Sequence, residues 1–460
     1  MTEGVRRHFI GIGGIGMSAL ARVLLSRGEH VSGSDMQSTP LLDELRAEGA
    51  EIFIGHDASN LGDAGEAIVS SAIDRNNVEY QAAKHGKIPI VHRGELLARL
   101  VRERDGIAIC GTHGKTTTTA MVHATLRAGG VDAGLVLGGI DPQLGSNAVD
   151  GTSPWFLCEA DESDGSFTLL QPRIAVLTNI ENDHLNSDDE LPRLIDAFGE
   201  FLDRLPENGV AVVGTDNQNS APLAARTRRA RTISVGIAAR ADLTAANLTF
   251  VGLGSQFDLV ANDRTIAQVE LGVPGAINVQ NALAAIAVAR EVGVTLPAIL
   301  AGLQRFRGVR RRFDILARGE RLSVVDDYAH HPTAVRATIA AARHYHQGPL
   351  VVAFQPHRYS RTGYLAVEFA DALRGADRVY LTPIYAASEA PIPGVSERSI
   401  GDRLSERGLD VRYVARVEEL VERIESESLP GTLVLMLGAG SITLSAARLA
   451  ARALPAEALH

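Results

Sequence analysis

The chain alternates short, continuous apolar runs with longer segments in which apolar positions recur every three or four residues. Continuous runs are typical of strands buried on both faces of a parallel sheet, and the periodic segments are typical of helices packed on those faces. The order run, polar or glycine-rich turn, helix repeats along the sequence, so the pattern predicts an α/β protein built from βα units. The predicted strands are His8–Ile10, His30–Ser34, Glu51–Ile54, Ala67–Ser71, Ile107–Cys110, Trp155–Cys158, Ile174–Thr178, Leu322–Val325, Leu350–Phe354, Arg378–Leu381 and Thr432–Leu437.

These units fall into three segments. The polar stretch 102–106 predicts a linker after the first segment, and the basic cluster Arg310–Arg312 separates the second from the third. Between 232 and 272 the pattern changes to short alternating stretches, which predicts an antiparallel elaboration, and an alanine-rich helix follows at Asn278–Val292. A chain of 460 residues is too long for one core and suits roughly three domains. The predicted domains are 1–104, 105–308 and 309–460.

Composition narrows the classes of partner and the cellular setting. The net charge of -10 argues against nucleic-acid binding, because no general positive field is available. No apolar run approaches the ~20 residues of a membrane-spanning helix, and a strand and glycine loop follow the N-terminus at once, so we expect no membrane insertion and no signal sequence. Cys110 and Cys158 lack the spacing of a disulfide framework or a metal knuckle. A reduced, cytoplasmic setting is expected.

One loop predicts nucleotide chemistry. The predicted strand Ile107–Cys110 runs into a glycine turn and then into a helix-compatible segment. Backbone N–H groups and a helix N-terminus there can hold phosphates, Lys115 can reach the outer phosphates, and Thr116 can offer a hydroxyl to Mg²⁺. The motif is a shortened triphosphate-binding loop, because Ile109 stands where the full pattern has glycine. The alternative is a glycine turn that only caps a helix. The loop comprises Gly111, Thr112, His113, Gly114, Lys115, Thr116 and Thr117.

A second glycine loop lies near the N-terminus. Gly11-Ile-Gly13-Gly-Ile-Gly16 follows a predicted strand, and Asp35 comes 19 residues after Gly16 at the end of the next one. Glycines and an acid in this order are also the fingerprint of dinucleotide binding. An NAD-dependent dehydrogenase is therefore a rival interpretation at this point.

Acids and a histidine follow two strands of the second segment. Glu159 is the first polar residue after Trp155–Cys158, so its carboxylate should emerge at the same sheet edge as Lys115, and we expect it to bind a cation. Three further acids lie within the next five positions and would repel one another unless a cation or an arginine neutralised some of them. His184 ends the loop after Ile174–Thr178, and we expect it to bind a second Mg²⁺.

Two clusters in the third segment are too polar for a core. Asp326-Asp327-Tyr328-Ala-His330-His331-Pro332 and Gln355-Pro-His357-Arg358-Tyr-Ser-Arg361 each follow a predicted strand. The paired guanidiniums of Arg358 and Arg361 suit a carboxylate or phosphate.

Taken in order, these motifs closely resemble the Mur ligases of peptidoglycan synthesis, and the resemblance covers His8 to about Ile442. The matching motifs are His8–Ser18, Gly111–Thr117, Glu159–Asp164, Thr178–His184, Arg311–Asp314, Asp326–Pro332 and Phe354–Tyr359.

The resemblance implies an α/β fold of three domains: a Rossmann-like UDP-binding domain, a central P-loop ATPase-like domain with a small antiparallel elaboration, and a C-terminal Rossmann-like domain. It further implies an ATP- and Mg²⁺-dependent ligase. Within the family, the residues favour a member that joins L-alanine to the lactoyl carboxylate of UDP-N-acetylmuramate through an acyl phosphate.

The resemblance also implies residue roles. The UDP contacts would be Gly13, Ile15, Gly16 and Asp35, which reassigns the dinucleotide-like loop. Asn278 and Asn281 would address adenine, Arg312 the ATP phosphates and Asp327 the ribose. The metal ligands would be Thr116, Glu159 and His184. The catalytic residues would be Lys115, Glu159, His184 and His330, and the amino-acid site would include Tyr328, His357, Arg358 and Arg361.

Two positions depart from the family pattern: Ile277 replaces a histidine in the adenine motif, and Ser441 replaces an aspartate near the C-terminus. A ligase that adds a preformed tripeptide to the same UDP-sugar, an NAD-dependent dehydrogenase and a non-catalytic UDP-sugar-binding protein are the alternatives. The dehydrogenase and the binding protein leave Lys115, Glu159 and His184 without a role.

Overall fold

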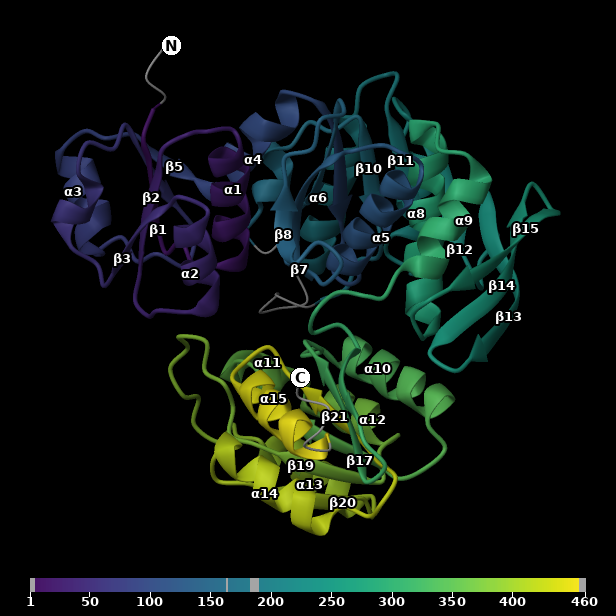
Figure 1. Cartoon of the computed structure of the whole chain (residues 1–460). Coiled ribbons are helices and arrows are strands. Elements are labelled where there is room, and N and C mark those ends of the chain that lie inside the picture. Colours follow the sequence, from purple (N-terminus) through teal and green to yellow (C-terminus); the bar gives the residue numbers. More distant parts are fainter. Residues whose placement is uncertain (1–4, 163, 183–189, 455–460) are drawn as a thin grey trace.

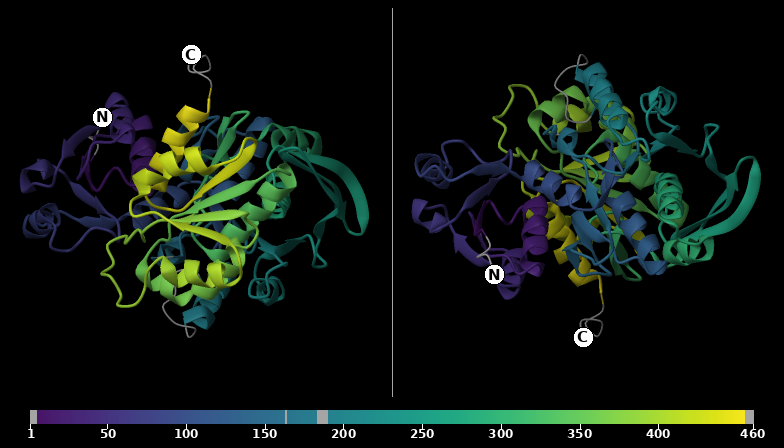
Figure 2. Two further views of the ribbon diagram at one scale, coloured as in Figure 1. Left: turned by 90° about the horizontal axis from the view of Figure 1, so that it is seen from below. Right: turned by 90° about the horizontal axis from the view of Figure 1, so that it is seen from above.

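The computed structural model of the chain describes residues 5–162, 164–182 and 190–454. Its strands form three separate sheets, one in each of an N-terminal unit (5–104), a central unit (105–308) and a C-terminal unit (309–454). Figure 1 shows the N-terminal and central units side by side, with the C-terminal unit beneath them. Seen from below, the C-terminal unit lies in front of the central unit (Figure 2). The predicted α/β fold with predominantly parallel sheets is confirmed.

The N-terminal unit contains β1 (Arg7–Ile10), α1 (Ile15–Ser26), β2 (Val31–Asp35), α2 (Pro40–Ala47), β3 (Glu51–Ile54), the 3₁₀ helix η1 (Ala58–Leu61), β4 (Glu66–Val69), α3 (Val78–His85), β5 (Ile90–His92) and α4 (Arg93–Arg102). All its strands pair in parallel, in the order β3-β2-β1-β4-β5. The strand order reverses beside β1, and ligands of open parallel sheets bind at such a reversal. The first glycine loop joins β1 to α1 at this place.

The central unit contains β6 (Asp105–Cys110), α5 (Lys115–Ala128), β7 (Gly134–Asp141), β8 (Ser146–Val149), β9 (Trp155–Glu159), the 3₁₀ helix η2 (Ser166–Leu169), β10 (Ile174–Leu177), α6 (Glu190–Asp203), β11 (Val210–Gly214), α7 (Ala221–Arg226), β12 (Arg231–Gly236), β13 (Leu243–Val251), β14 (Gly254–Ala261), β15 (Arg264–Leu271), α8 (Ala276–Val292) and α9 (Leu296–Arg305). The strand order is β15-β14-β13-β12-β11-β10-β6-β9-β7-β8. Strands β10, β6 and β9 are parallel neighbours, so the residues that follow them meet at one edge.

The C-terminal unit contains β16 (Asp314–Arg318), β17 (Leu322–Asp327), α10 (Pro332–Tyr345), β18 (Leu350–Phe354), α11 (Tyr359–Tyr364), α12 (Ala366–Leu373), β19 (Arg378–Leu381), α13 (Arg398–Glu406), β20 (Asp410–Tyr413), the 3₁₀ helix η3 (Val417–Glu419), α14 (Leu420–Glu427), β21 (Thr432–Leu437) and α15 (Ile442–Ala453). The order is β16-β17-β21-β18-β19-β20, and among the described strands of this C-terminal sheet only the β16–β17 pairing is antiparallel.

Two sequence-based boundaries need correction. Helix α4 continues to Arg102 and β6 begins at Asp105, so the linker predicted at 102–106 is wrong: only Glu103 and Arg104 lie between these elements. The antiparallel elaboration is present but starts later than expected, because β12 still pairs in parallel with β11 and β13, and only β13, β14 and β15 form a meander.

The N-terminal and central units share a buried apolar core. One continuous cluster runs from Phe9 and Leu20 in the N-terminal unit to Cys110 and Phe156 in the central sheet. Polar contacts reinforce this packing. Asn147 of β8 is fully buried, and its amide nitrogen donates to the Ile15 carbonyl oxygen (2.8 Å) and to Ser18 Oγ (2.9 Å). The first turn of α1 is therefore fixed to the central sheet.

The C-terminal unit joins the central unit through a smaller set of contacts. The ring of Phe250 in β13 stacks on that of His344 in α10, with 4.3 Å between centroids. The backbone N–H of Arg310 donates to the Ile140 carbonyl oxygen at 3.0 Å, which holds the connecting segment against β7. No helix in the described ranges is long and apolar enough to cross a bilayer.

Glu79 of α3 is a wholly buried carboxylate that ties the N-terminal unit together. It accepts hydrogen bonds from Ser34 Oγ (2.5 Å) and Asn60 Nδ2 (2.7 Å), and the imidazole of His8 lies 3.7 Å away. Burial by itself would raise the pKa of this carboxyl, but the hydrogen bonds and the charge of His8 together lower it from 4.5 to about 2. The ionised form is therefore strongly favoured in the folded state.

Because the folded-state pKa of Glu79 lies below its unfolded value, this carboxylate stabilises the fold above about pH 4.5 and loses its contribution as the pH falls toward about 2. We expect Glu79→Gln to cost about 2 kcal/mol at neutral pH and to remove this part of the acid sensitivity. Urea unfolding followed at neutral and acidic pH measures both effects. Glu95→Gln, at a half-exposed surface pair with Arg99, should change stability by less than about 0.5 kcal/mol. Equal losses in the two variants would contradict the prediction.

Candidate functional site

The predicted phosphate loop lies between β6 and α5, as its sequence indicates. Gly111 and Gly114 have φ angles of 118° and 82°, which side-chain-bearing residues rarely adopt. A Cβ atom added at Gly114 would also lie only 2.6 Å from the side-chain oxygen of Asn281 in α8. Glycine at this position therefore satisfies both the backbone turn and the close approach of α8. Thr116 and Thr117 follow in the first turn of α5, where both are buried.

Lys115 is held inside the curve of its own loop. Its Nζ donates to both carboxylate oxygens of Glu162, at 2.7 and 2.9 Å, and to the carbonyl oxygens of Gly111 (2.7 Å) and Thr112 (3.1 Å). Burial tends to lower the pKa of this ammonium group, but the adjacent Glu162 carboxylate raises it overall. The lysine is thus charged and nearly buried, and an incoming phosphate would compete with Glu162 for it.

Glu159 lies beside Thr116, as predicted from the shared sheet edge. Its carboxylate accepts from Thr116 Oγ1 at 3.0 Å and from the backbone N–H of Gly138 at 2.5 Å. Burial raises the pKa of this carboxyl, and the charges of Lys115 and Arg312 oppose the rise. A hydroxyl and a carboxylate oxygen side by side, with no nitrogen or sulfur donor in this pair, form a donor set that fits Mg²⁺.

The acids after Glu159 are neutralised by an arginine that sequence analysis did not identify. Arg93, the first residue of α4 in the N-terminal unit, donates from Nη2 to Asp161 and to Asp164, both at 2.7 Å. Its Nη1 would lie 3.3 Å from a Cβ atom placed on Gly16. Arg93 therefore connects the N-terminal glycine loop with the acidic loop of the central unit.

A Thr-Asn pair after β10 fixes the phosphate loop from a third side. Asn179 accepts from the His113 N–H at 2.9 Å and donates to the His113 carbonyl oxygen at 3.0 Å, while Thr178 Oγ1 donates to the same carbonyl at 2.7 Å. The Thr112 N–H donates to the Asn179 carbonyl oxygen at 3.0 Å. The predicted metal ligand His184 lies outside the described residues.

A cavity of about 170 Å³ opens beside this loop. Asn281 and Ile277 of α8 line it, whereas Asn278 donates to the Pro274 carbonyl oxygen at 2.7 Å and accepts from Asn281 Nδ2 at 3.1 Å. Mixed apolar and amide surfaces of this kind suit a planar heterocyclic base. The lining residues are His113, Leu177, Thr178, Asn179, Glu181, Gly214, Asp216, Asn217, Val235, Ile277, Gln280, Asn281, Ala284 and Thr333.

Arg312 and Asp327 lie on the C-terminal side of the site. The guanidinium carbon of Arg312 is 5.0 Å from the centre of the Tyr328 ring. Burial raises the pKa of both Asp327 and Glu159, and the charge of Arg312 opposes the rise. Asp327 is buried, and its carboxylate accepts from the backbone N–H groups of Phe313 (3.0 Å) and Ala329 (2.8 Å). In this structure Asp327 therefore holds the connecting segment, and its predicted ribose contact stays a prediction.

The predicted amino-acid site is a chain of stacked rings. Tyr328 meets His330 edge-on with 4.9 Å between centroids, His330 meets His357 at 5.6 Å, and His357 stacks on Tyr385 at 5.5 Å. Arg361 is buried, with Nη1 3.3 Å from His357 Nδ1.

Arg358 immediately precedes α11 with φ at 71°, and its N–H donates to the Tyr385 carbonyl oxygen at 2.8 Å. Tyr385 was missed because it lies in the long loop after β19, with no motif around it.

The N-terminal glycine loop is shaped by the acid that suggested a dinucleotide site. Asp35 accepts from the Gly13 N–H at 2.9 Å, and a Cβ atom on Gly13 would lie 2.7 Å from the same carboxylate oxygen. Ile15 and Gly16 form the first turn of α1, whose N-terminus can face a diphosphate. The structure thus gives Asp35 a supporting role in the loop itself.

Family models match the chain over three consecutive stretches: the Mur ligase family, catalytic domain, at residues 6–105; the Mur ligase middle domain at 109–289; and the Mur ligase, glutamate ligase domain, at 311–440. The chain is 44% identical over 439 residues to a UDP-N-acetylmuramate–L-alanine ligase of Geobacter sp. (strain M21), which covers 95% of both chains.

The chain is also 45% identical over 455 residues to an enzyme of the same name from Acidithiobacillus ferrooxidans, covering 97% of this chain and 98% of the relative. Among solved structures, the UDP-N-acetylmuramate–alanine ligase of Thermotoga maritima has 31% identity and a TM-score of 0.84, over 97% of this chain and 98% of that chain.

The Lys115–Glu162 pair generates a test of the loop. Glu162→Gln keeps a hydrogen-bond acceptor but removes a negative charge that competes with phosphate for Lys115 and repels it. We expect ATP to bind about fivefold more tightly, which corresponds to about 1 kcal/mol. Isothermal titration calorimetry measures the change. Asp164→Asn removes a charge from the same loop at a site paired with Arg93, and it should have a smaller effect. Weaker or unchanged ATP binding in Glu162→Gln would contradict the competition.

Proposed function

The chain belongs to the Mur ligase family, and we infer from this that it joins L-alanine to the lactoyl carboxylate of UDP-N-acetylmuramate in peptidoglycan synthesis, with ATP as the energy source. The observation that carries the chemistry is the meeting of Lys115, Thr116 and Glu159 at the carboxyl edge of β6 and β9. Similarity to alanine-adding ligases over nearly the full length of the chain supports the choice of substrates.

The first step transfers a phosphoryl group to a carboxylate. A carboxylate oxygen attacks the γ-phosphorus of ATP, the bond to the β-phosphate oxygen breaks, and ADP leaves with that electron pair. Both reactants are anions, so the reaction needs cationic groups that hold them in line. We assign this role to Lys115, after it exchanges Glu162 for phosphate, and to Arg312. The backbone N–H groups of the loop hold the remaining phosphate oxygens.

The second step forms the amide. The neutral amine of L-alanine attacks the acyl carbon, and inorganic phosphate leaves from the tetrahedral intermediate. Arg358 and Arg361 would hold the carboxylate of alanine. His330 would accept a proton from the attacking amine: its Nδ1 lies 2.8 Å from the Tyr328 carbonyl oxygen, which can only accept, so Nδ1 carries the hydrogen and Nε2 the lone pair.

We propose that Mg²⁺ takes part through Thr116 and Glu159, whose adjacent oxygen atoms suit it. When bound, the ion neutralises phosphate charge during the transfer. His184 stays the predicted ligand of a second Mg²⁺. The cavity beside Asn281 and Ile277 would receive the adenine ring, with the apolar side chain of Ile277 offering contact with the base in place of the family's histidine.

The other ligands are assigned to the three predicted domains of the chain. Residues 1–104 would bind the UDP portion at Gly13, Ile15 and Gly16, residues 105–308 the ATP, and residues 309–460 the amino acid. Fixation of the first turn of α1 by Asn147 supports a constant distance between the UDP loop and the phosphate loop. We propose a cytoplasmic location, where the two buried thiols would stay reduced.

The acceptor assay tests this function. ADP release with UDP-N-acetylmuramate should appear with L-alanine, while glycine and L-serine measure how strictly the site selects its acceptor. If ADP appears only with a preformed tripeptide, the alanine assignment is wrong and the recycling ligase is right. If no acceptor releases ADP but NAD binds, the dehydrogenase alternative returns.

The matched control for this assay is Lys115→Ala. We expect it to reduce turnover by at least about a thousandfold, because the phosphates lose their fixed cation. Binding of UDP-N-acetylmuramate, measured by calorimetry, should stay within about twofold, since its predicted contacts lie in the other unit. Turnover that survives this substitution would place the phosphate site elsewhere.

The raised pKa of Glu159 predicts a pH dependence for Mg²⁺. A metal ion needs the ionised carboxylate, and burial favours the protonated form, so Mg²⁺ affinity should fall as the pH drops through the raised pKa, by up to about tenfold per pH unit. Turnover measured against Mg²⁺ concentration from neutral to mildly acidic pH gives this slope. Glu159→Gln should bind Mg²⁺ weakly, and its affinity should not depend on pH in this range. Asp164→Asn should keep the pH dependence of the wild type. An unchanged slope in Glu159→Gln would assign the pH dependence to another group.

A further inference from the structure

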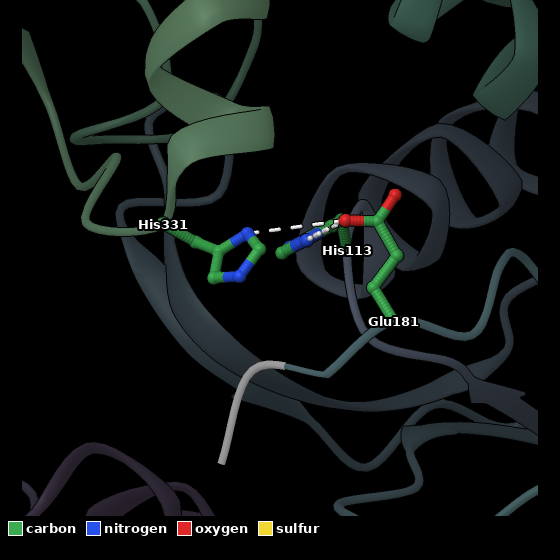
Figure 3. Close-up of side chains that lie close together, drawn as sticks. All are labelled: His113, Glu181 and His331. Atoms are coloured by element: carbon green, nitrogen blue, oxygen red, sulfur yellow. Dashed lines mark hydrogen bonds and ion pairs between the residues drawn. The ribbon is translucent and has the colours of Figure 1, made fainter. Parts of the chain in front are cut away.

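A cluster of three side chains lies where the phosphate loop meets the C-terminal unit, and none of the three has a role in the two chemical steps above, although His113 and Glu181 also line the cavity beside the phosphate loop. His113 comes from the phosphate loop, Glu181 from the segment after β10, and His331 from the residue that precedes α10. One donor atom from each lies within 4.8 Å of the other two. Figure 3 shows both imidazoles beside the carboxylate of Glu181.

The distances are close to those of a metal site. His113 Nε2 is 3.2 Å and His331 Nδ1 is 3.9 Å from the same oxygen of Glu181. A tetrahedral zinc ion with bonds of about 2.0–2.1 Å holds its ligand atoms about 3.3 Å apart. The two distances to Glu181 are therefore within about 0.6 Å of the separation that zinc requires.

A hydrogen bond behind His331 sets its tautomer in the way that a metal ligand requires. His331 Nε2 lies 3.2 Å from the Asn182 carbonyl oxygen, which can only accept, so Nε2 carries the hydrogen and Nδ1 presents its lone pair toward Glu181. A backbone carbonyl behind a ligating histidine is the usual outer partner that fixes the tautomer. Thr333 Oγ1 donates to Glu181 at 2.6 Å and holds the carboxylate in place.

Charge and burial point in the same direction. The side chains of His113, Glu181 and His331 are 10%, 26% and 7% exposed, so solvent screens them little. Burial by itself would raise the pKa of Glu181, but hydrogen bonds from His113 and Thr333 and the charges of both imidazoles lower it overall. The carboxylate is thus ionised, and a metal ion bound to the three groups would take over the positive charge that protonated imidazoles otherwise supply, with release of the proton from His113 Nε2.

We propose that His113, Glu181 and His331 form a binding site for a divalent transition-metal ion of the zinc class, distinct from the oxygen-donor site at Thr116 and Glu159. Two imidazoles and one carboxylate suit zinc and disfavour magnesium. His113 and Glu181 also line the cavity beside the phosphate loop, so a ligand from that cavity would be able to reach the ion. The ion links the phosphate loop of the central unit to His331 of the C-terminal unit. It therefore holds the central and C-terminal units together and inhibits turnover.

Cobalt serves as the spectroscopic probe for the site. The full chain, with saturating Mg²⁺ present to occupy the oxygen-donor site, is titrated with Co²⁺ and then with Zn²⁺. One equivalent of Co²⁺ should give the intense visible bands of four-coordinate geometry, and Zn²⁺ should abolish them. Glu181→Gln and His331→Gln, which alter different units, should each weaken binding by at least about tenfold, with circular dichroism confirming that both variants are folded.

Two control variants separate this site from other histidines. His85→Gln, on exposed α3, and His184→Gln, at the predicted magnesium ligand, should keep the cobalt spectrum. Zn²⁺ should inhibit turnover by the wild type. The same Zn²⁺ concentrations should leave the turnover of His331→Gln equal to the rate that this variant shows without Zn²⁺. Loss of the spectrum in His184→Gln alone, unchanged binding in the two cluster variants, or six-coordinate cobalt bands in the wild type would each overturn the proposal.

Discussion

The site depends on how four carboxylates are accommodated within the six residues that start at the last residue of β9. Glu159, Asp161, Glu162 and Asp164 repel one another at short range, and solvent screens Glu162 and Asp164 little because their side chains are only 4% and 8% exposed. Lys115 compensates Glu162, and Arg93 compensates both Asp161 and Asp164. None of these ion pairs includes Glu159, so its charge is the one that a bound cation would balance.

This compensation links parts of the chain that are far apart in sequence. Arg93 belongs to the N-terminal unit and lies next to Gly16, so two charges of the acidic loop are neutralised from the first unit. Asn147 fixes the same first turn of α1, which contains Gly16, to β8. Substrate bound at the glycine loop and nucleotide bound at the phosphate loop are therefore held by one continuous body. The C-terminal unit joins through fewer contacts, and it carries the groups that must meet the acceptor amino acid.

Sequence patterns predicted the parts of the site that are local. Glu159 and Thr116 could be placed together because each follows a buried parallel strand, and parallel neighbours deliver their next residues to one edge. The ring cluster from Tyr328 to His357 could be predicted as a site because its polar residues follow strands. Arg93, Tyr385 and Glu181 could not, since their partners are 68 or more residues away or lie in a loop without a motif. The hydrogen bond from the Gly13 N–H to Asp35 could not be predicted either. A glycine loop followed by an acid 19 residues later suggests a ligand contact for the acid, in dinucleotide and UDP sites alike.

The Lys115–Glu162 pair has a mechanistic consequence beyond stability. A buried lysine without a counter-ion would shed its proton or destabilise the loop, so a loop that must stay folded before nucleotide arrives needs an internal anion. Glutamate supplies it, and its carboxylate occupies a place around the ammonium group that a phosphate oxygen would take. Nucleotide binding then exchanges one anion for another around a cation that is already positioned, which leaves little to reorganise when the phosphoryl group moves. Transfer to a carboxylate needs this arrangement more than transfer to a hydroxyl does, because the acceptor brings a further negative charge to the same place.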